Sequence, residues 1–302
     1  MCGITGYITK KYCSDDVIEK MLHTLESRGP DGYGIDSWQS DNYQVTFGHR
    51  RLSIIDLSDN AKQPMSYDEL HIVFNGEIYN YQEIKNELIS IGHSFNSGSD
   101  TEVILHSIRE WGIEAIQRWH GMFSIVLFDE RERTITAIRD RAGVKPFFYF
   151  QNSDIFIFGS ELKAILAHPD FKKELDINAV ASYFQYGYIS WPHTIWHETY
   201  KLPPGHFMQL DLVSGKVIQR QYWSVYSSYL KPKMNISFDD ALRGTETVLD
   251  KAINYRMVAD VPVGVFLSGG YDSTCVAAML QKNRTEKIKT FTIGIADSHM
   301  DE

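Results

Sequence analysis

The chain has 302 residues, a formal net charge of −9 and an ordinary globular composition, 43% hydrophobic and 23% charged. This composition excludes disorder, and an acidic chain without a long Lys/Arg block argues against nucleic acid as a main partner. The most apolar run, residues 122–128, is far shorter than the ~20 residues that cross a bilayer, and no secretory signal is evident. Three cysteines without a C-x-x-C pair, and histidines without paired spacing, argue against a disulfide framework, a standard zinc site or a metal cluster. We therefore expect a cytoplasmic protein that does not enter a membrane.

The first part of the chain opens with a predicted strand and a predicted helix. The strand covers residues 3–9 and the helix residues 14–27, with Gly29 placed to end it. The apolar residues of this helix share one face: Val17, Ile18, Met21, Leu22 and Leu25. Alternation of apolar and polar residues then predicts strands over 43–55 and 71–77.

Two helices and a run of strands follow. A helix over residues 81–91 has Asn80 as its predicted N-cap, and Ser99 with Glu102 has the form of a capping box that starts a third helix. Strands are predicted over residues 122–129, 134–140, 146–150 and 155–158. Because strands and helices are segregated along the chain, we expect an α+β fold of stacked layers rather than an alternating βαβ fold.

The pattern changes after residue 210. We divide the chain into a domain of residues 1–210, a linker of residues 211–235, clearest over 226–235, and a second region of residues 236–302. This region combines helical spacing from Phe238 to Ile253, an apolar strand over 261–267, a Gly-rich turn, a helix over 272–281 and an apolar strand over 288–295. Such a β-loop-α-β order opens a parallel nucleotide-binding sheet. Residues 261–302 are too few for a domain, which usually needs ~100 residues, and Cys275 is expected in the core.

Cys2 directly follows the initiator methionine. Removal of Met1 would leave Cys2 with a free α-amine, whose reference pKa of about 7.7–8.0 lies close to the thiol value of about 8.5. One residue could then supply both the nucleophile and its base. Taken alone, Cys2 favours the simpler interpretation of an incidental cysteine at the second position, because a lone cysteine is weak evidence for a nucleophile.

An ordered series of motifs decides between these interpretations of Cys2. The motifs are CGI at residues 2–4, RGPDG at 28–32, HRRLSI at 49–54, FNGEIYN at 74–80, SGSDTE at 97–102, GMF at 121–123, RDR at 139–141, GVKP at 143–146 and SELKA at 160–164. The series resembles the class II glutamine amidotransferase domain of glutamine-hydrolysing asparagine synthetases over nearly all of residues 1–210. The resemblance implies an N-terminal-nucleophile (Ntn) αββα sandwich.

The resemblance also implies a role for each motif residue. Cys2 attacks the side-chain amide of glutamine, while the Asn75 side chain and the Gly76 N–H form an oxyanion hole. Arg51 binds the α-carboxylate in a fork that lysine cannot imitate. The remaining substrate-binding residues are Leu52, Ile54, Glu77 and Asp100, of which the two acids receive the glutamine ammonium group.

Each of these residues has a structural alternative. Asn75-Gly76 is a common type I′ hairpin signal. Asp100 could support the N-terminus of its helix, and Arg51 alternates with apolar residues and could be a solvated strand residue.

A second chemical motif, LSGGYDST, covers residues 267–274 between the apolar strand and its helix. Its glycines let backbone N–H groups face a ligand, and two serine hydroxyls add donors, although the lysine of a Walker motif is absent. The loop resembles the pyrophosphate-binding loop (PP-loop) of ATP pyrophosphatases, which implies an incomplete α/β PP-loop domain. Tyr271 and Thr274 stand where that family more often has Leu and Ser.

The same resemblance implies a set of ATP-binding residues. They are Leu267, Ser268, Gly269, Gly270, Asp272, Ser273 and Ile293. Asp272 would also help to position Mg²⁺, which offsets phosphate charge. The alternatives are a Gly-rich turn that binds no ligand and, for Leu267 and Ile293, ordinary positions in the sheet core.

Together the two resemblances imply a glutamine-dependent asparagine synthetase. Ammonia from L-glutamine would amidate L-aspartate through β-aspartyl-AMP formed from MgATP. The expected partner is a second copy in a homodimer or a complementing synthetase polypeptide. Two alternatives stay open. One is a free-standing glutaminase that supplies ammonia to a separate acceptor enzyme, such as one that modifies a sugar. The other is a non-catalytic partner that docks onto a complete synthetase.

Overall fold

The computed structural model describes residues 2–282 and 284–294 and divides the chain into two compact units, Met1–Leu230 and Lys231–Glu302. Each unit is described by itself. Among the described residues, no helix combines the length and the apolar character needed to cross a bilayer.

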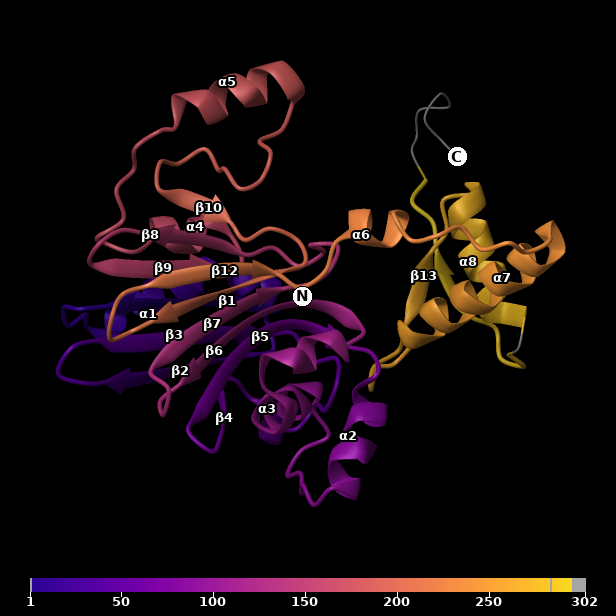
Figure 1. The fold of residues 1–302 in the computed structure, drawn as a ribbon, viewed down its shortest axis with the longest axis horizontal. Helices are drawn as coiled ribbons and strands as arrows, with labels where there is room; N and C mark the ends of the chain where they lie inside the picture. The colour runs from indigo at the N-terminus through magenta and orange to yellow at the C-terminus, as the bar shows by residue number, and fades with distance from the viewer. Residues whose placement is uncertain (1, 283, 295–302) are drawn as a thin grey trace. The chain divides into compact units, whose positions relative to one another are not determined.

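The first unit contains two six-stranded antiparallel sheets (Figure 1). The first sheet has the order β10-β8-β9-β1-β3-β2. Its strands are β1 (Gly3–Thr9), β2 (Gly32–Gln39), β3 (Gln44–Arg51), β8 (Phe148–Gln151), β9 (Ile155–Gly159) and β10 (Thr199–Lys201). The second sheet has the order β12-β11-β7-β6-β5-β4. Its strands are β4 (Met65–Tyr67), β5 (Leu70–Ile78), β6 (Gly121–Asp129), β7 (Thr134–Arg139), β11 (His206–Asp211) and β12 (Val217–Gln221).

The main core lies between the two sheets. Ile4 and Phe47 of the first sheet pack with Val73 and Val126 of the second, and all four are fully buried. Alternation along β1 explains this placement, because successive side chains of a strand point to opposite faces. Ile4 therefore joins the core between the sheets, whereas Tyr7 joins a second core on the outer face.

Helices cover both outer faces of the sandwich. Helices α1 (Asp15–His23) and α4 (Leu162–Leu166) contact the first sheet, and α3 (Asp100–Trp111), with α2 (Tyr81–Ser90) beside it, contacts the second (Figure 1). All the apolar residues assigned to the buried face of the first helix are buried, although that helix ends at His23 and a 3₁₀ turn, Glu26–Arg28, follows. Further 3₁₀ turns cover Asp59–Ala61 and Gly112–Gln117, and α5 (Ile177–Tyr186) completes the helices of the sandwich. The layer order confirms the predicted α+β sandwich.

Two predicted helix caps differ in detail from the structure. Asn80 occupies the N-cap position of α2, but its amide bonds to the Arg118 carbonyl and the His120 N–H, at 3.0 and 2.8 Å, rather than to the helix. The side chain of Ser99 does cap α3, accepting from the Thr101 N–H at 3.1 Å. Glu102 instead accepts from the N–H groups of residues 96 and 97, so it binds the preceding loop and no reciprocal capping box forms.

The second sheet continues past residue 210. Strand β12 pairs with β11 across a turn in which the Asp211 carboxylate accepts from the N–H groups of residues 213 and 214. The short helix α6 (Val225–Tyr229) follows. The predicted start of the linker at residue 211 is therefore too early, because this hairpin belongs to the sandwich.

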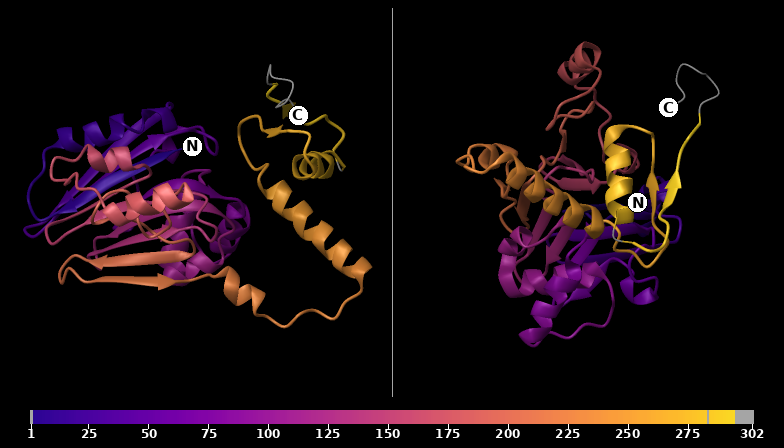
Figure 2. Two further views of the ribbon diagram at one scale, coloured as in Figure 1. Left: turned by 90° about the horizontal axis from the view of Figure 1, so that it is seen from above. Right: turned by 90° about the vertical axis from the view of Figure 1, so that its right-hand side faces the viewer.

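The second unit contains α7 (Phe238–Tyr255), β13 (Gly264–Phe266), α8 (Tyr271–Lys282) and β14 (Lys289–Phe291) (Figure 2). Strands β13 and β14 are parallel, as predicted, but shorter than the apolar runs suggested. The predicted end of the last strand, Ile295, lies outside the described residues. Leu280 is the one buried side chain among the described residues of this unit, and Cys275 is exposed, contrary to the expectation of a core position.

Candidate active site

One pocket of the first unit brings together every residue that the sequence assigned to glutamine chemistry. It encloses about 520 Å³ of empty space, including its opening to solvent. The predicted residues that line it are Cys2, Arg51, Leu52, Ile54, Asn75, Gly76, Glu77 and Asp100. They come from the start of β1, the end of β3 and the loop after it, the last part of β5 and the N-terminus of α3.

Cys2 is held at the pocket by its sulfur and by its backbone. The Leu52 N–H donates to Cys2 Sγ at 3.3 Å, and Sγ lies 3.6 Å from the Leu52 carbonyl oxygen. Arg28 Nε donates to the Cys2 carbonyl at 2.9 Å, and Arg28 Nη1 pairs with Glu161 at 3.0 Å. Burial raises the pKa of the thiol, so the Cys2 sulfur is protonated at neutral pH and needs a base before it can act as a nucleophile.

Asn75 and Gly76 lie inside β5, where they pair with Ser124 and Phe123 of β6. The hairpin-turn interpretation of this dipeptide is therefore wrong. A side chain at Gly76 would collide with the Met122 carbonyl oxygen, which explains why the strand needs glycine there. The Asn75 side chain is fully buried, and neither its oxygen nor its nitrogen has a hydrogen-bond partner in the described part of the chain. A buried amide without partners is costly unless a ligand satisfies it.

Two carboxyl groups lie at the other side of the pocket. Asp100 Oδ2 accepts from the Ile78 N–H at 2.9 Å, which ties α3 to β5. Burial, reinforced by the neighbouring Glu77, raises the pKa of Asp100 to about 7. Burial also raises the pKa of Glu77, while the Lys145 ammonium opposes that rise. The pocket can thus present Asp100 in either its neutral or its ionised form to a ligand near neutral pH.

Arg51 leaves β3 at the rim of the pocket. Its Nη1 donates to the Ser58 carbonyl at 2.8 Å, and its Nη2 donates to the Asp56 carbonyl. The Asp56 carboxylate in turn accepts from the Gly98 N–H at 2.7 Å, so the loop after β3 is joined to the loop before α3. These bonds hold the guanidinium in place with further N–H donors available to a carboxylate.

The pocket also contains residues to which the sequence gave no role. His49 of β3 is buried beside the backbone of Phe74. Burial lowers the pKa of His49 to about 3, so the ring is neutral. Lys145 also lines the pocket, and burial lowers the pKa of its ammonium group, an effect that the neighbouring Glu77 opposes. His49 belongs to the motif HRRLSI and Lys145 to the motif GVKP, so membership of these motifs was the signal that could have assigned them to the site.

The Gly-rich loop of the second unit is exposed at residues 268–270. Gly269 has a φ of +85°, and the hydroxyls of Ser268 and Ser273 lie 3.2 Å apart, bonded to each other. Leu267 and Ile293 follow β13 and β14, so they lie at the carboxyl end of the parallel strands, where nucleotides bind in such sheets. Ile293 is 80% exposed, which contradicts its interpretation as sheet core. Asp272 is exposed in the first turn of α8, a position that fits a role beside the phosphates.

Residues 1–223 match the glutamine amidotransferase domain family. The chain belongs to this family. Residues 244–302 match a second family, asparagine synthase. The matched residues agree with the resemblance inferred from the motifs.

The curated relatives of this amidotransferase chain carry related names. It is 38% identical to asparagine synthetase [glutamine-hydrolyzing] 3 of Bacillus subtilis, over 97% of this chain and 48% of that protein. It is 39% identical to putative asparagine synthetase [glutamine-hydrolyzing] 2 of Methanocaldococcus jannaschii, over 97% of this chain and 60% of that protein. A third relative, 33% identical over 93% of this chain and 43% of its own length, is amidase chry2 of Gibberella zeae. The chain thus spans about half the length of these relatives.

Solved structures agree on the fold. The glutamine phosphoribosylpyrophosphate amidotransferase of B. subtilis matches with a TM-score of 0.55 and 16% identity, over 96% of this chain and 65% of that one. A structure described as the allosteric regulatory enzyme of purine biosynthesis matches with a TM-score of 0.56 and 17% identity, over 95% of this chain and 65% of that one. These matches confirm the predicted Ntn amidotransferase fold.

Proposed function

We propose that the first unit hydrolyses L-glutamine to glutamate and ammonia with Cys2 as the nucleophile. The observation that carries this proposal is that every residue assigned to glutamine chemistry lines one pocket together with Cys2. Membership of the glutamine amidotransferase family supports the same conclusion.

In the first step, Cys2 Sγ attacks the side-chain amide carbon of glutamine. The α-amine that removal of Met1 exposes takes the thiol proton, because burial keeps the thiol protonated at neutral pH. The negative charge that develops on the amide oxygen is met by Asn75 Nδ2 and the Gly76 N–H. The unpartnered state of the Asn75 amide supports this role, since a preorganised donor costs no rearrangement during the reaction.

In the second step, the C–N bond breaks and the α-ammonium returns its proton to the leaving nitrogen, which departs as ammonia. A thioester between the glutamyl carbonyl and Cys2 remains. Water then adds to the thioester carbon, the C–S bond breaks, and glutamate leaves with the thiol restored.

Recognition of glutamine is assigned to charged groups at the two sides of the pocket. The remaining N–H donors of Arg51 bind the α-carboxylate, and Asp100 with Glu77 binds the α-ammonium group. Leu52 and Ile54 supply the wall between them. Because the ammonium favours ionised carboxyls, its binding lowers the raised pKa of Asp100.

We further propose that the ammonia serves ATP-dependent amidation of L-aspartate to L-asparagine. The match of residues 244–302 to asparagine synthase and the names of the relatives support this ligase activity, and with it ATP as substrate. In this proposal the backbone N–H groups of residues 268–270 hold the pyrophosphate, and Asp272 helps to hold Mg²⁺, which neutralises phosphate charge when it is bound. The reaction belongs in the cytoplasm, with a second copy or a complementing synthetase polypeptide as partner.

A glutaminase assay tests the first half of the proposal. Cys2→Ala should reduce glutamate release by at least roughly a thousandfold, the scale seen when a catalytic nucleophile is removed. Cys275→Ser is the matched control, because that thiol is exposed in the other unit. Glutamate release that persists in the Cys2→Ala chain contradicts the nucleophile assignment. Mass spectrometry of the active protein should also find Cys2 as its first residue.

One observation favours a second candidate, a glutaminase that supplies a separate acceptor enzyme. The loop residues Ser268, Gly269 and Gly270, assigned to ATP, are exposed in the described part of the chain. Adding ATP and aspartate to the glutaminase assay separates the candidates. AMP, pyrophosphate and asparagine appear together if the chain has ligase activity, whereas a free-standing glutaminase releases ammonia alone.

A further inference from the structure

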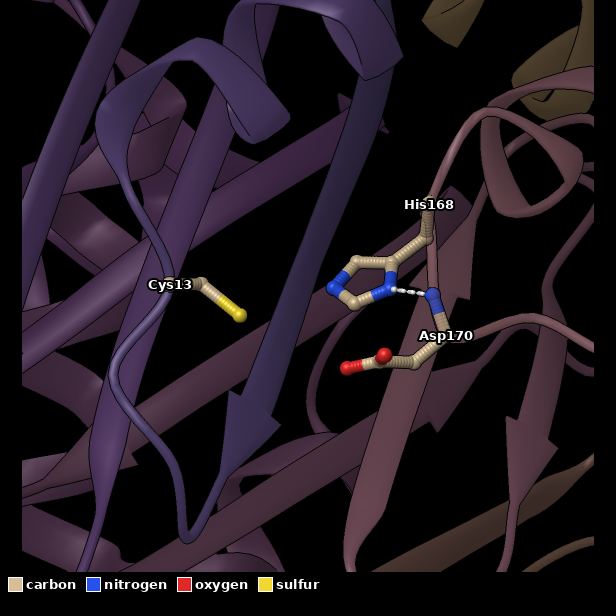
Figure 3. A group of neighbouring side chains, drawn as sticks. All are labelled: Cys13, His168 and Asp170. Atoms are coloured by element: carbon tan, nitrogen blue, oxygen red, sulfur yellow. Dashed lines mark hydrogen bonds between the residues drawn. The ribbon is translucent and has the colours of Figure 1, made fainter.

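A second cluster of reactive side chains lies outside the pocket, on the outer face of the first sheet. It contains Cys13, from the loop between β1 and α1, and His168 and Asp170, from the segment after α4 (Figure 3). Each residue offers one ligand atom, and these atoms all lie within 4.8 Å of one another. Figure 3 shows the Cys13 sulfur, the His168 ring and the Asp170 carboxylate facing a common space.

The segments that carry these side chains are held by the fold. Gln44 clamps the backbone of Cys13, accepting from its N–H at 2.8 Å and donating to its carbonyl at 3.1 Å, and Gln44 is itself buried. The His168 ring packs edge-on against Tyr7 with centroids 5.0 Å apart. Its backbone N–H donates to the Ile165 carbonyl at 3.1 Å. Ligands fixed in this way are preorganised for a bound ion.

A polar atom in this cluster lacks a partner. His168 is 2% exposed, and its Nε2 forms no hydrogen bond in the described part of the chain. In Figure 3 this side of the ring faces the Cys13 sulfur. A buried ring nitrogen without a partner carries a desolvation penalty that a bound ligand would remove.

We propose that Cys13, His168 and Asp170 form a binding site for a divalent transition-metal ion, with Zn²⁺ as the best fit. Sulfur, imidazole nitrogen and carboxylate oxygen are the three ligand types that zinc accepts. Three protein ligands leave one tetrahedral position for water. Because Asp170 is exposed, an ion and that water can enter from the side of the cluster where Asp170 lies.

Binding changes protons in a defined way. The Cys13 thiol loses its proton to solvent as the metal–sulfur bond forms. The Asp170 N–H donates to His168 Nδ1 at 3.2 Å, which places the ring proton on Nε2 in the metal-free chain. Coordination through Nε2 moves that proton to Nδ1 and breaks this one long hydrogen bond. The net result is release of one proton for each metal ion bound.

The position of the site indicates a structural role. Strand β1 separates Cys2 from Cys13, and its seven residues at ~3.3 Å each span about 23 Å, too far for direct contact with glutamine chemistry. The ion would join the loop between β1 and α1 to the segment after α4, two regions that are distant in sequence and pack on the same outer face. Such a link should raise the melting temperature.

Cobalt titration tests the site through a signature that only a thiolate ligand gives. The full chain with Cys2→Ser and Cys275→Ser keeps Cys13 as its single cysteine. Adding Co²⁺ should produce a thiolate-to-cobalt charge-transfer band that saturates at one equivalent, and Zn²⁺ should displace it and raise the melting temperature. Introducing Cys13→Ser should abolish the band.

Asp170→Asn keeps the test decisive if the Cys13 variant folds poorly, because Asp170 is exposed. It should weaken Co²⁺ binding by at least about tenfold, whereas Asp154→Asn, an exposed aspartate elsewhere on the unit, should leave binding unchanged. The proposal is overturned if the single-cysteine chain gives no thiolate band, or if equal affinity persists after Asp170→Asn. Glutaminase activity is not a readout, so the outcome is independent of the proposed function.

Discussion

The two units carry motifs of similar clarity but surround them very differently. In the first unit, Asn75 of β5 and Asp100 of α3 are buried, and backbone groups of neighbouring segments hold Cys2 and Arg51. In the second unit, the loop residues from Ser268 to Gly270 are exposed, and the helix α7, 18 residues long, has no buried side chain. A motif thus specifies which groups are present, while the layers packed around it determine their electrostatics.

The difference has consequences for chemistry. Burial raises the pKa of Asp100 to about 7 and leaves the Asn75 amide without partners. At the described residues of the ATP loop, the hydroxyls of Ser268 and Ser273 bond to each other in contact with solvent. Substitutions at the pocket of the first unit should therefore have large and specific effects on glutamine hydrolysis. Changes in the second unit should have small effects on the same reaction.

Among the remaining predictions, the largest effect is expected for the proposed oxyanion donor. Asn75→Ala should lower kcat of glutamine hydrolysis by roughly 100- to 1,000-fold with little change in KM, because the donor acts on charge that exists only in the transition state. Steady-state kinetics of glutamate release provide the measurement.

Ser124→Ala is the matched control for Asn75→Ala. Ser124 pairs with Asn75 across β5 and β6, is equally buried, and also has an unpartnered polar atom. Removing its hydroxyl should leave kcat nearly unchanged. Equal losses in both variants would show that the effect of Asn75→Ala is structural.

Much of the fold could be predicted because its elements have a clear period. Strand β1 has the predicted bounds, and the buried face of α1 was identified residue by residue. Strand β2 was missed, since its sequence GYGIDSWQ contains two glycines and its side chains are intermediate or exposed, so that no alternation marks it. Strand β12 was assigned to the linker because it is half-exposed and ends in polar residues.

The candidate site could be predicted only in part. The residues assigned to catalysis and glutamine binding were identified through resemblance, and each of these assigned residues lines the pocket. His49 and Lys145 were not assigned, because burial rather than spacing gives them their altered pKa. Cys13 and His168 meet only through packing on the outer face of the first sheet, and no local spacing in the sequence indicates a cluster there.

Arg51→Lys should raise KM for glutamine by roughly 10- to 100-fold and change kcat little. A lysine cannot form the paired contacts of a guanidinium with a carboxylate, and hydrogen bonds to charged groups contribute about 1.5–3 kcal/mol. The neighbouring Arg50→Lys is the control, because Arg50 bonds to the Leu22 carbonyl and lies outside the pocket. If KM is the same in the two variants, Arg51 does not bind the carboxylate.

Glutamine affinity should depend on pH through Asp100. The carboxyl, with its pKa raised to about 7 by burial, is largely protonated at pH 6 and ionised at pH 8. Since the glutamine ammonium needs the ionised form, the dissociation constant should fall with rising pH, by up to about tenfold per unit below pH 7, and level off above it. Calorimetry on the Cys2→Ala chain measures this without turnover.

Asp100→Asn separates this linkage from other titrations. The variant should bind glutamine weakly and with no slope between pH 6 and pH 8, because its amide does not ionise. A slope that persists in the Asp100→Asn chain assigns the pH dependence to another group, of which Glu77 is the nearest candidate.

The smallest effect is expected from removing the second unit. The core between the sheets consists of residues of the first unit alone, and the pocket is lined by residues between Cys2 and Lys145. A chain that ends at Leu230 should therefore keep its rate of glutamine hydrolysis and change its melting temperature by less than about 2 °C, equivalent to under ~1 kcal/mol in a domain of this size. Calorimetric melting and the glutaminase assay provide the measurements. A large loss of activity would instead mean that exposed loops of the second unit, despite their lack of a core, contribute to the geometry around Cys2.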